Sequence, residues 1–168
     1  RSSLPALDVS TFHPGKVTDM YCMCRDCSSL KSLDVSNFNT ANVTDMASMF
    51  YHCSALTSLD VSKFNTANVT TMSFMFSNCS ALTTIFCNDD WKSDVVQKST
   101  DMFMNCTKLK GAVSYDANKL DVTMANPTTG YFTKIGEITP VAYVVEDGST
   151  LTFYYDTNKE MRTGTVYG

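Results

Sequence analysis

The sequence is poor in charged residues. Only 18% of its 168 residues are charged, no lysine or arginine cluster is longer than a pair, and the formal net charge is −4. A protein that follows a nucleic-acid backbone needs clustered cations to neutralise phosphates, so this composition argues against nucleic-acid binding. No apolar stretch approaches the roughly 20 residues that cross a bilayer as a helix. We therefore expect no membrane insertion of this segment.

The motifs of common catalytic sites are also missing. The chain has two histidines, His13 and His52, and it contains no glycine-rich phosphate loop, no GxSxG elbow and no HExxH. Asp89-Asp90 beside Trp91 could suggest sugar hydrolysis or calcium binding, but an adjacent acidic pair in a loop is usually solvated surface. We expect a protein that is not an enzyme and needs no cofactor or metal. An enzyme built on residues 85–110 is the weakest of three functional hypotheses.

The start of the chain, RSSLPALDVS, lacks an initiator methionine and a signal-like apolar region, and the end, GTVYG, falls within an expected strand. We therefore expect a piece of a longer mature protein.

A repeat of 26 residues fills most of the chain. Residues 33–58 (LDVSNFNTANVTDMASMFYHCSALTS) and 59–84 (LDVSKFNTANVTTMSFMFSNCSALTT) differ at seven positions, and residues 7–32 fit the same frame with more drift. Residues 85–110 fit with one extra residue. Aligned columns include Leu7, Leu33, Leu59 and Ile85, and also Val17, Val43, Val69 and Val95. Such a period predicts about four stacked coils that bury one another's apolar faces.

Each repeat has two halves with different apolar periods. Leu59 and Val61 alternate with polar residues, which predicts a half-buried strand. In residues 68–79 the apolar positions advance by three, three, one and three, which predicts one face of a short helix with Asn68 as its N-cap. We therefore predict an α/β leucine-rich-repeat solenoid, with parallel strands on one face and short helices on the other.

Two further segments come after the coils. Residues 111–138 break the repeat and contain Pro127 and Gly130, so we expect them to form a C-terminal cap. Residues 139–168 contain two apolar runs around Asp147-Gly148, which predicts a β-hairpin segment, truncated from a longer chain.

The repeat LDVSxFNTxNVTxMxxMFxxCSxL resembles that of the BspA-like leucine-rich-repeat surface proteins of host-associated bacteria. The YDANKLD and LTFYYD segments resemble the segments that trail such arrays. The resemblance implies a secreted or surface-anchored, non-enzymatic protein with a role in adhesion. Residues 13–16 (HPGK) and Cys24 depart from the pattern, and no binding site of the family maps onto identified residues here.

The motif CMCRDC, residues 22–27, could ligate zinc, act in redox chemistry or form disulfides. In the repeat frame, however, Cys27 shares a column with Cys53, Cys79 and Cys106, and Cys24 takes the place of Phe50. The favoured interpretation is a ladder of buried free thiols. A disulfide between adjacent coils, about 5 Å apart, is not excluded by distance. A linear ladder lacks the tetrahedral convergence that zinc needs.

Polar side chains at matching positions of the strand face form the candidate binding site. They are Ser32, Asp34, Ser36, Ser58, Asp60 and Ser62, with Asp8 and Ser10 as counterparts in the first repeat. One interpretation is a concave ligand-binding stripe. The other is that each carboxylate accepts hydrogen bonds from nearby hydroxyls or amides. An acidic, hydroxyl-rich stripe suits a basic or polar protein partner or a glycan.

Two functional hypotheses from different classes remain. The first is a cell-surface or secreted binding module, located outside the cell or on the bacterial surface, that adheres to host or other-cell proteins through the solenoid. The second is a structural spacer with no ligand of its own, which the near-identity of the second and third repeats fits equally well. Phe74 lies opposite the expected apolar stripe and could contact a partner, although single exposed apolar residues are common.

Overall fold

A computed structural model describes residues 6–7, 17–135, 143–146, 151–157 and 160–165. The chain divides into two compact units, Arg1–Lys134 and Ile135–Gly168. Each unit is described by itself.

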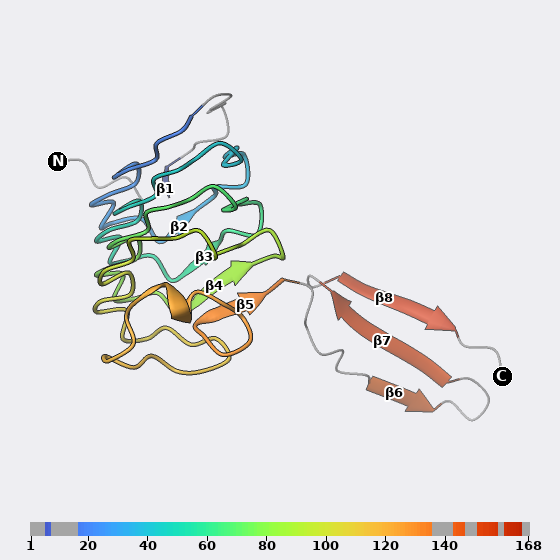
Figure 1. Cartoon of the computed structure of the whole chain (residues 1–168). Coiled ribbons are helices and arrows are strands. Elements are labelled where there is room, and N and C mark those ends of the chain that lie inside the picture. Colours follow the sequence, from blue (N-terminus) through green and yellow to red (C-terminus); the bar gives the residue numbers. More distant parts are fainter. Residues whose placement is uncertain (1–5, 8–16, 136–142, 147–150, 158–159, 166–168) are drawn as a thin grey trace. The chain divides into compact units, whose positions relative to one another are not determined.

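The first unit is a stack of coils whose short strands run parallel on one face (Figure 1). β1 (Ala6–Leu7) pairs with β2 (Ser32–Leu33), and a second sheet has the order β3 (Ser58–Asp60), β4 (Thr84–Cys87) and β5 (Phe132–Lys134). Ser32 aligns with Ala6 and Thr84 with Ser58. The register is thus the 26-residue period of the sequence, and the predicted parallel-strand repeat is confirmed.

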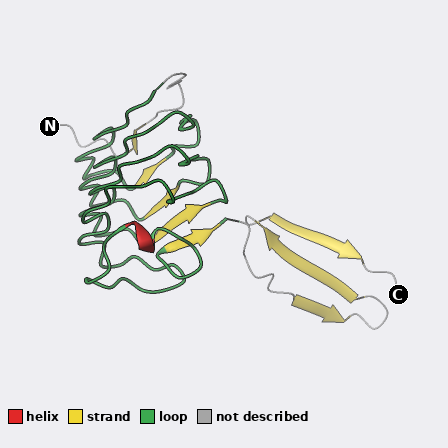
Figure 2. Ribbon diagram, viewed as in Figure 1, coloured by secondary structure: helices red, strands yellow, loops and turns green. Residues whose placement is uncertain are grey.

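The predicted short helices are wrong. Among the described residues the single helical element is the 3-10 turn η1 (Val122–Met124), and the expected helix of residues 68–79 is replaced by consecutive turns over residues 73–78 (Figure 2). Asn68 caps no helix; its side-chain amide donates to the Ala41 carbonyl of the preceding coil at 2.8 Å. No described helix has the length and hydropathy of a membrane span.

Backbone hydrogen bonds between coils explain why turns replace the helices. The amides of Met46, Ser48, Phe50 and His52 donate to carbonyls of the next coil, those of Thr71, Ser73, Met75 and Ser77, each at 2.9 Å. A helix would use the same amides within its own turn. In this structure every second amide donates to a carbonyl of the next coil. Hydrogen bonds therefore join the coils along the turn face.

Two of those four donor residues have left-handed backbone conformations. Ser48 has φ 55° and His52 φ 60°, and the amides of Met49 and Cys53 close turns onto Met46 and Phe50 at 3.3 and 3.2 Å. A positive φ at the third position of a four-residue turn is the type II pattern. An α-helix cannot contain such residues, which is the physical reason for the failed prediction.

The core runs through the middle of the stack. Leu59, Val61, Met72 and Phe76 are at most 1% exposed. Aromatic rings also stack between coils, with ring centroids 5.7 Å apart for Phe50 and Phe76 and 5.6 Å for Phe76 and Phe103. Successive turns bring every third or fourth side chain inward, so the apolar spacing that indicates a helix is equally well produced by this turn path.

The fourth coil differs from the aligned columns at one position. Val95, placed in the column of Val69, is 44% exposed, and the neighbouring Val96 packs against the core instead. The amide of Val96 closes a turn onto Ser93 at 3.1 Å, as that of Val69 does onto Thr66 at 3.0 Å. The extra residue of the fourth repeat therefore comes before Val96.

Residues 111–134 end the stack without repeating it. β5 adds to β4, with Phe132 aligned to Ile85, and Tyr131 and Phe132 are fully buried under the last coil. The Tyr131 hydroxyl accepts from the Asp116 amide at 2.9 Å, which holds the loop against the core. A Cβ at Gly130 would collide with the Met124 carbonyl, so this close approach requires glycine.

The second unit is a three-stranded antiparallel sheet. It consists of β6 (Tyr143–Glu146), β7 (Leu151–Thr157) and β8 (Glu160–Thr165), in chain order. β6 and β7 pair with Tyr143 opposite Tyr154. Asp147-Gly148, the expected turn of this hairpin, lies outside the described residues.

Candidate ligand-binding groove

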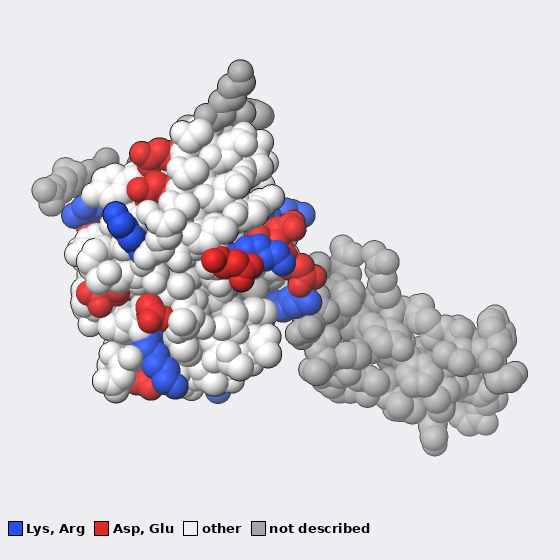
Figure 3. Space-filling view, viewed as in Figure 1, with Lys and Arg blue, Asp and Glu red and all other residues white. Residues whose placement is uncertain are grey.

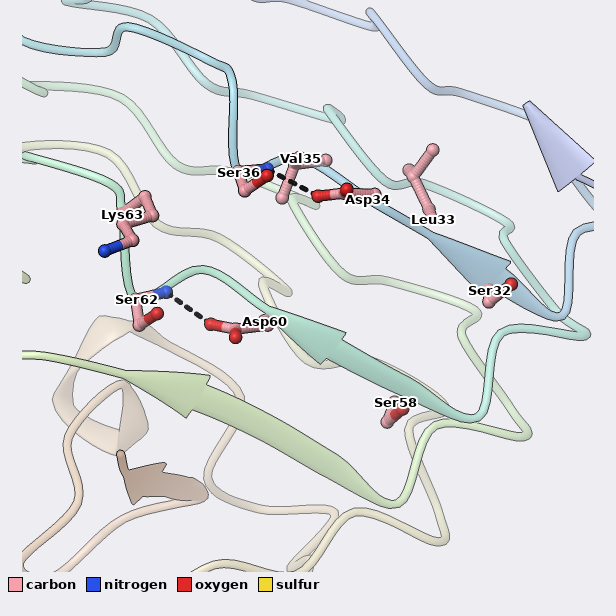
Figure 4. A pocket seen from close by; sticks show the side chains of 9 residues that line it. All are labelled: Ser32, Leu33, Asp34, Val35, Ser36, Ser58, Asp60, Ser62 and Lys63. Atoms are coloured by element: carbon pink, nitrogen blue, oxygen red, sulfur yellow. Dashed lines mark hydrogen bonds between the residues drawn. The ribbon is translucent and has the colours of Figure 1, made fainter. Parts of the chain in front are cut away.

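A groove of about 350 Å³ opens on the strand face of the first unit. All six residues of the sequence-predicted site line it: Ser32, Asp34, Ser36, Ser58, Asp60 and Ser62. Leu33, Val35 and Lys63 complete the lining (Figure 4). The structure therefore brings the candidate residues together, while Asp8 and Ser10 lie outside the described residues.

The groove coincides with a break in strand pairing. Its walls are residues 32–36 of one coil and residues 58–63 of the next. These contain β2 and β3, which are in contact but belong to separate sheets, whereas β1–β2 and β3–β4 are paired. The groove forms here because no strand ladder joins these two coils.

Strand geometry decides which side chains reach the groove. Leu33, Val35, Leu59 and Val61 are buried, and the alternate residues Asp34 and Asp60 are exposed on the outer face. Side chains two residues apart share a face of a strand, so each aspartate stands between two serines. Asp34 and Asp60 hold equivalent positions in adjacent coils, one repeat apart.

Each aspartate also stabilises its own coil. The Asp34 Oδ1 accepts a hydrogen bond from the Ser36 amide at 2.9 Å, and the Asp60 Oδ1 accepts one from the Ser62 amide at 2.8 Å (Figure 4). These are Asx turns that end the strands. The amide-bonding interpretation is therefore correct for both aspartates.

Ser62 is the one polar residue of the groove lining that is buried. It is 6% exposed, and its amide donates to the Asp60 Oδ1 at 2.8 Å. Among the described residues, the buried side-chain nitrogen or oxygen without a hydrogen-bond partner is Trp91 Nε1, outside the groove. The groove lining therefore contains no buried side-chain atom that the described part of the fold leaves unsatisfied.

Lys63 is the polar lining residue that sequence reasoning missed. It takes the place of Asn37 in the preceding repeat and lies at the end of the groove next to Ser62 (Figure 4). The signal was one of the seven differences between the two repeats. No ion pair joins Lys63 to Asp60 in the described part of the chain.

The acidic stripe ends after the third coil. Phe86 of β4 aligns with Asp60, and Thr133 of β5 aligns with Phe86. Figure 3 shows one face of the molecule, on which most of the first unit is uncharged and the charged side chains form small groups of mixed sign. The two aspartates thus lie on a stack with few charges.

The other singled-out residues are accounted for by packing and surface contacts. Asp89 forms an ion pair with Lys134 at 3.0 Å, and Trp91 is buried against Phe132 with ring centroids 4.9 Å apart. Phe74, expected to be exposed, is half-buried and has φ 58°.

His52 lies in a small charged cluster on the turn face. Its Nδ1 is 3.0 Å from the Asp26 Oδ1, and the Arg25 guanidinium lies 4.9 Å above the Tyr51 ring. The hydrogen bond with His52, together with Arg25, holds the pKa of Asp26 below its usual value. This cluster joins the first two coils at their exposed turns.

The cysteine ladder is made of free thiols. Cys53, Cys79 and Cys106 are buried, and Cys27 is half-buried. The three buried thiols donate to backbone carbonyls of the preceding coil, those of Cys24, Phe50 and Phe76, at 3.0 to 3.1 Å. The favoured interpretation of the ladder is correct, and these intercoil hydrogen bonds are an addition to it.

The environment of three thiols favours their protonated form. Burial raises the pKa of Cys24 and of Cys106 to about 12. A hydrogen bond with Cys79, together with burial, raises the pKa of Cys53. Within CMCRDC, Cys22 is half-exposed and accepts from Arg25 Nη1 at 3.7 Å, while Cys24 is buried. No three histidine, cysteine or acidic side chains among the described residues are placed to hold a metal ion.

Comparison with known proteins gives one match. The model of a family described as Mycoplasma protein of unknown function, DUF285, matches residues 2–123. This range includes the whole groove. No curated protein and no solved structure matches the chain.

Proposed function

Because the chain belongs to the Mycoplasma protein family of unknown function DUF285, whose model covers residues 2–123, we propose its function from the site alone: a non-catalytic module that binds a protein partner through the groove between β2 and β3. We also propose a more specific assignment of the fold. The strand repeat is that of a BspA-like leucine-rich-repeat solenoid in which turns replace the helices.

The observation that carries this proposal is the groove itself. Six exposed or groove-lining polar residues, repeated from one coil to the next, line a hollow of about 350 Å³ where the strand ladder is interrupted. Extended stacks of this kind use the strand face for recognition. The groove presents carboxylates and hydroxyls with a single ammonium group, which suits a partner rich in hydrogen-bond donors.

We place the module outside the cell or on the cell surface, where adhesion to host or other-cell proteins would occur. Cys24 and Cys106 are compatible with an oxidising compartment, because burial and a raised pKa suppress the thiolate that reacts with oxidants. This compatibility supports the localisation without requiring it.

A structural spacer is the second candidate function. Its specific support is that the groove residues Asp34, Ser36, Asp60 and Ser62 follow the repeat without interrupting it, as they would if selected for coil closure alone. The two candidates differ in whether the strand face has a ligand.

Obstruction of the groove separates them. We would immobilise the chain and measure binding of purified extracellular-matrix proteins and of glycans by surface plasmon resonance. Ser58→Trp fills the groove, and Ser80→Trp, at an exposed turn position, is the matched control. A saturable protein ligand that binds the control and loses at least about tenfold in affinity for Ser58→Trp supports the proposal.

If the folded chain shows no saturable binding at micromolar concentration, the spacer function is favoured. Equal binding by both variants would move the site away from the groove. Saturable binding of a glycan alone would contradict a protein partner.

A further inference from the structure

We infer that the N-terminal end of the stack is a docking surface for one further coil of the 26-residue repeat, the coil whose last residues are 1–6. The surface, which we call the open end, consists of residues 17–27 of the first coil. It lies at the opposite end of the stack from β5 and shares no residue with the groove (Figure 1). The inference does not depend on the proposed function.

Backbone carbonyls of the open end form a ladder of unused acceptors. In each later coil, four alternate carbonyls of the turn half accept amides from the coil before. In the second coil the distances are 2.8 to 3.1 Å, and the acceptors are the carbonyls of Asp45, Ala47, Met49 and Tyr51. No described residue donates to the equivalent carbonyls of the first coil, those of Asp19, Tyr21, Met23 and Arg25. The open end therefore has the acceptor half of a coil interface.

Donors of the open end are unused as well. Across the next coil boundary, the Thr44 amide and hydroxyl donate to the Thr18 carbonyl, and the Cys53 thiol donates to the Cys24 carbonyl. Thr18 and Cys27 hold the same columns one coil earlier. Among the described residues none accepts from the Thr18 amide or hydroxyl or from the Cys27 thiol.

Apolar side chains of the open end are less covered than their counterparts. Val17, Met23 and Cys27 are partly exposed, although they pack against the core. One coil later the same columns are at most 1% exposed, at Val43, Met49 and Cys53. A coil placed on the open end would remove this apolar surface from water, which is the main favourable contribution to association.

The repeat frame identifies the coil that fits this surface. Residues 1–6 (RSSLPA) align with residues 27–32 (CSSLKS) and share Ser2, Ser3 and Leu4 with them. Ala6 pairs with Ser32 in the register of one repeat. Residues 1–6 are therefore the end of a repeat, and a coil of this repeat provides amides at alternate turn residues, as the first three coils do.

A second copy of the chain does not fit the open end. Two such ends facing each other would place carbonyl acceptors against carbonyl acceptors. At the other end of the stack, residues 111–134 already bind two of the alternate amides. The Phe103 amide donates to the Leu120 carbonyl at 3.0 Å, and the Asn105 amide donates to the Tyr115 hydroxyl at 3.2 Å.

Insertion of one coil into the full chain tests the inference. A copy of residues 33–58 placed between Ala6 and Leu7 adds a coil in register. The matched control inserts a copy of residues 33–55 at the same point and shifts the register by three residues. We expect the in-register coil, and not the control, to raise the melting temperature by about 3 °C or more, because one coil interface is gained.

The rate of cysteine alkylation under native conditions, followed by peptide mass spectrometry, locates the effect. With the in-register coil, Cys27 should react at least about tenfold more slowly than in the unmodified chain, because its thiol becomes covered and gains a carbonyl acceptor. Its rate should approach that of the buried Cys53. In the control insertion Cys27 should react as it does in the unmodified chain.

Three results would overturn the inference. The first is an in-register coil that leaves the melting temperature and the reactivity of Cys27 unchanged or abolishes cooperative unfolding. The second is equal stabilisation by both insertions, since an interface in register would then not be its cause. The third is a dimer of the unmodified chain in sedimentation, with protection of Cys27 that rises with concentration, which would identify a second copy as the occupant.

Discussion

At the scale of single residues, the cysteines show how position in the repeat determines chemistry. Cys24 and Cys106 are buried and their pKa values are raised to about 12 because burial disfavours the thiolate. Cys22, in the same six-residue motif as Cys24, is half-exposed. Spacing within CMCRDC suggests one reactive cluster, but the coil directs these side chains into different surroundings.

This difference predicts a pH dependence of stability. In the unfolded chain a cysteine ionises near its ordinary pKa of about 8.5, whereas folded Cys24 and Cys106 keep their protons to about pH 12. Above the unfolded value the unfolded state binds fewer protons, so stability falls as pH rises. Urea midpoints should be steady to about pH 8 and decline between about pH 9 and 12. A double variant, Cys24→Ala with Cys106→Ala, should show a shallower decline; identical slopes would refute the assignment.

The groove-lining polar residues could be predicted from the sequence because they occupy strand positions. Alternation assigned Asp34 and Asp60 to the outer face, and the repeat placed them in adjacent coils. The break in strand pairing that opens the groove and the entry of Lys63 into its lining depend on how two particular coils meet. Neither feature can be deduced from the repeat period, because the period assigns the same structure to every coil.

At the scale of elements, the turn half of each coil is where sequence reasoning failed. Apolar residues at steps of three and four fit a helix, and they also fit successive type II turns. The distinction lies in where the amides donate, which is decided by neighbouring coils. One column did hold a signal: Asp26, His52, Asn78 and Asn105 all have positive φ, and Asp, His and Asn are enriched in that conformation. The other column held none, because Ser48 and Phe74, also at positive φ, are ordinary residues in a helix.

Ser48→Gly tests the turn path directly. Ser48 has φ 55°, a conformation that costs a side-chain-bearing residue about 1 kcal/mol and glycine almost nothing. We expect Ser48→Gly to raise the free energy of unfolding by up to about 1 kcal/mol, measured by urea titration. In a helix the same change would be destabilising.

The neighbouring Ala47→Gly is the matched control. Ala47 is buried beside Ser48 and does not have a positive φ, so glycine there should lower stability by about 0.5 to 1 kcal/mol. Loss of stability in both variants would indicate a helix in this segment.

At the scale of the whole molecule, the first unit is bonded along its stack on two faces, by strands on one and by alternate turn amides on the other. The period predicted the strand register and the core columns of the second and third coils. It could not predict the path of residues 111–134, whose packing on the last coil depends on Tyr131, Phe132 and the close approach at Gly130.

A stack held by a constant register should tolerate removal of one whole coil. Deletion of residues 33–58 joins Ser32 to Leu59 and keeps every column in phase. We expect a cooperatively folded chain whose melting temperature falls by about 5 °C or more, because one coil interface is lost. Deletion of residues 33–55 shifts the register by three residues and should abolish cooperative unfolding. Similar melting curves for the two deletions would contradict a fixed 26-residue register.

The central claim is that a partner binds between the second and third coils on the strand face. Hydrogen–deuterium exchange of the chain with and without a saturating protein ligand found by surface plasmon resonance tests it most directly. Slower exchange confined to residues 32–36 and 58–63 is the predicted result. Unchanged exchange there, with protection at turn residues 45–53 and 71–79, would contradict it.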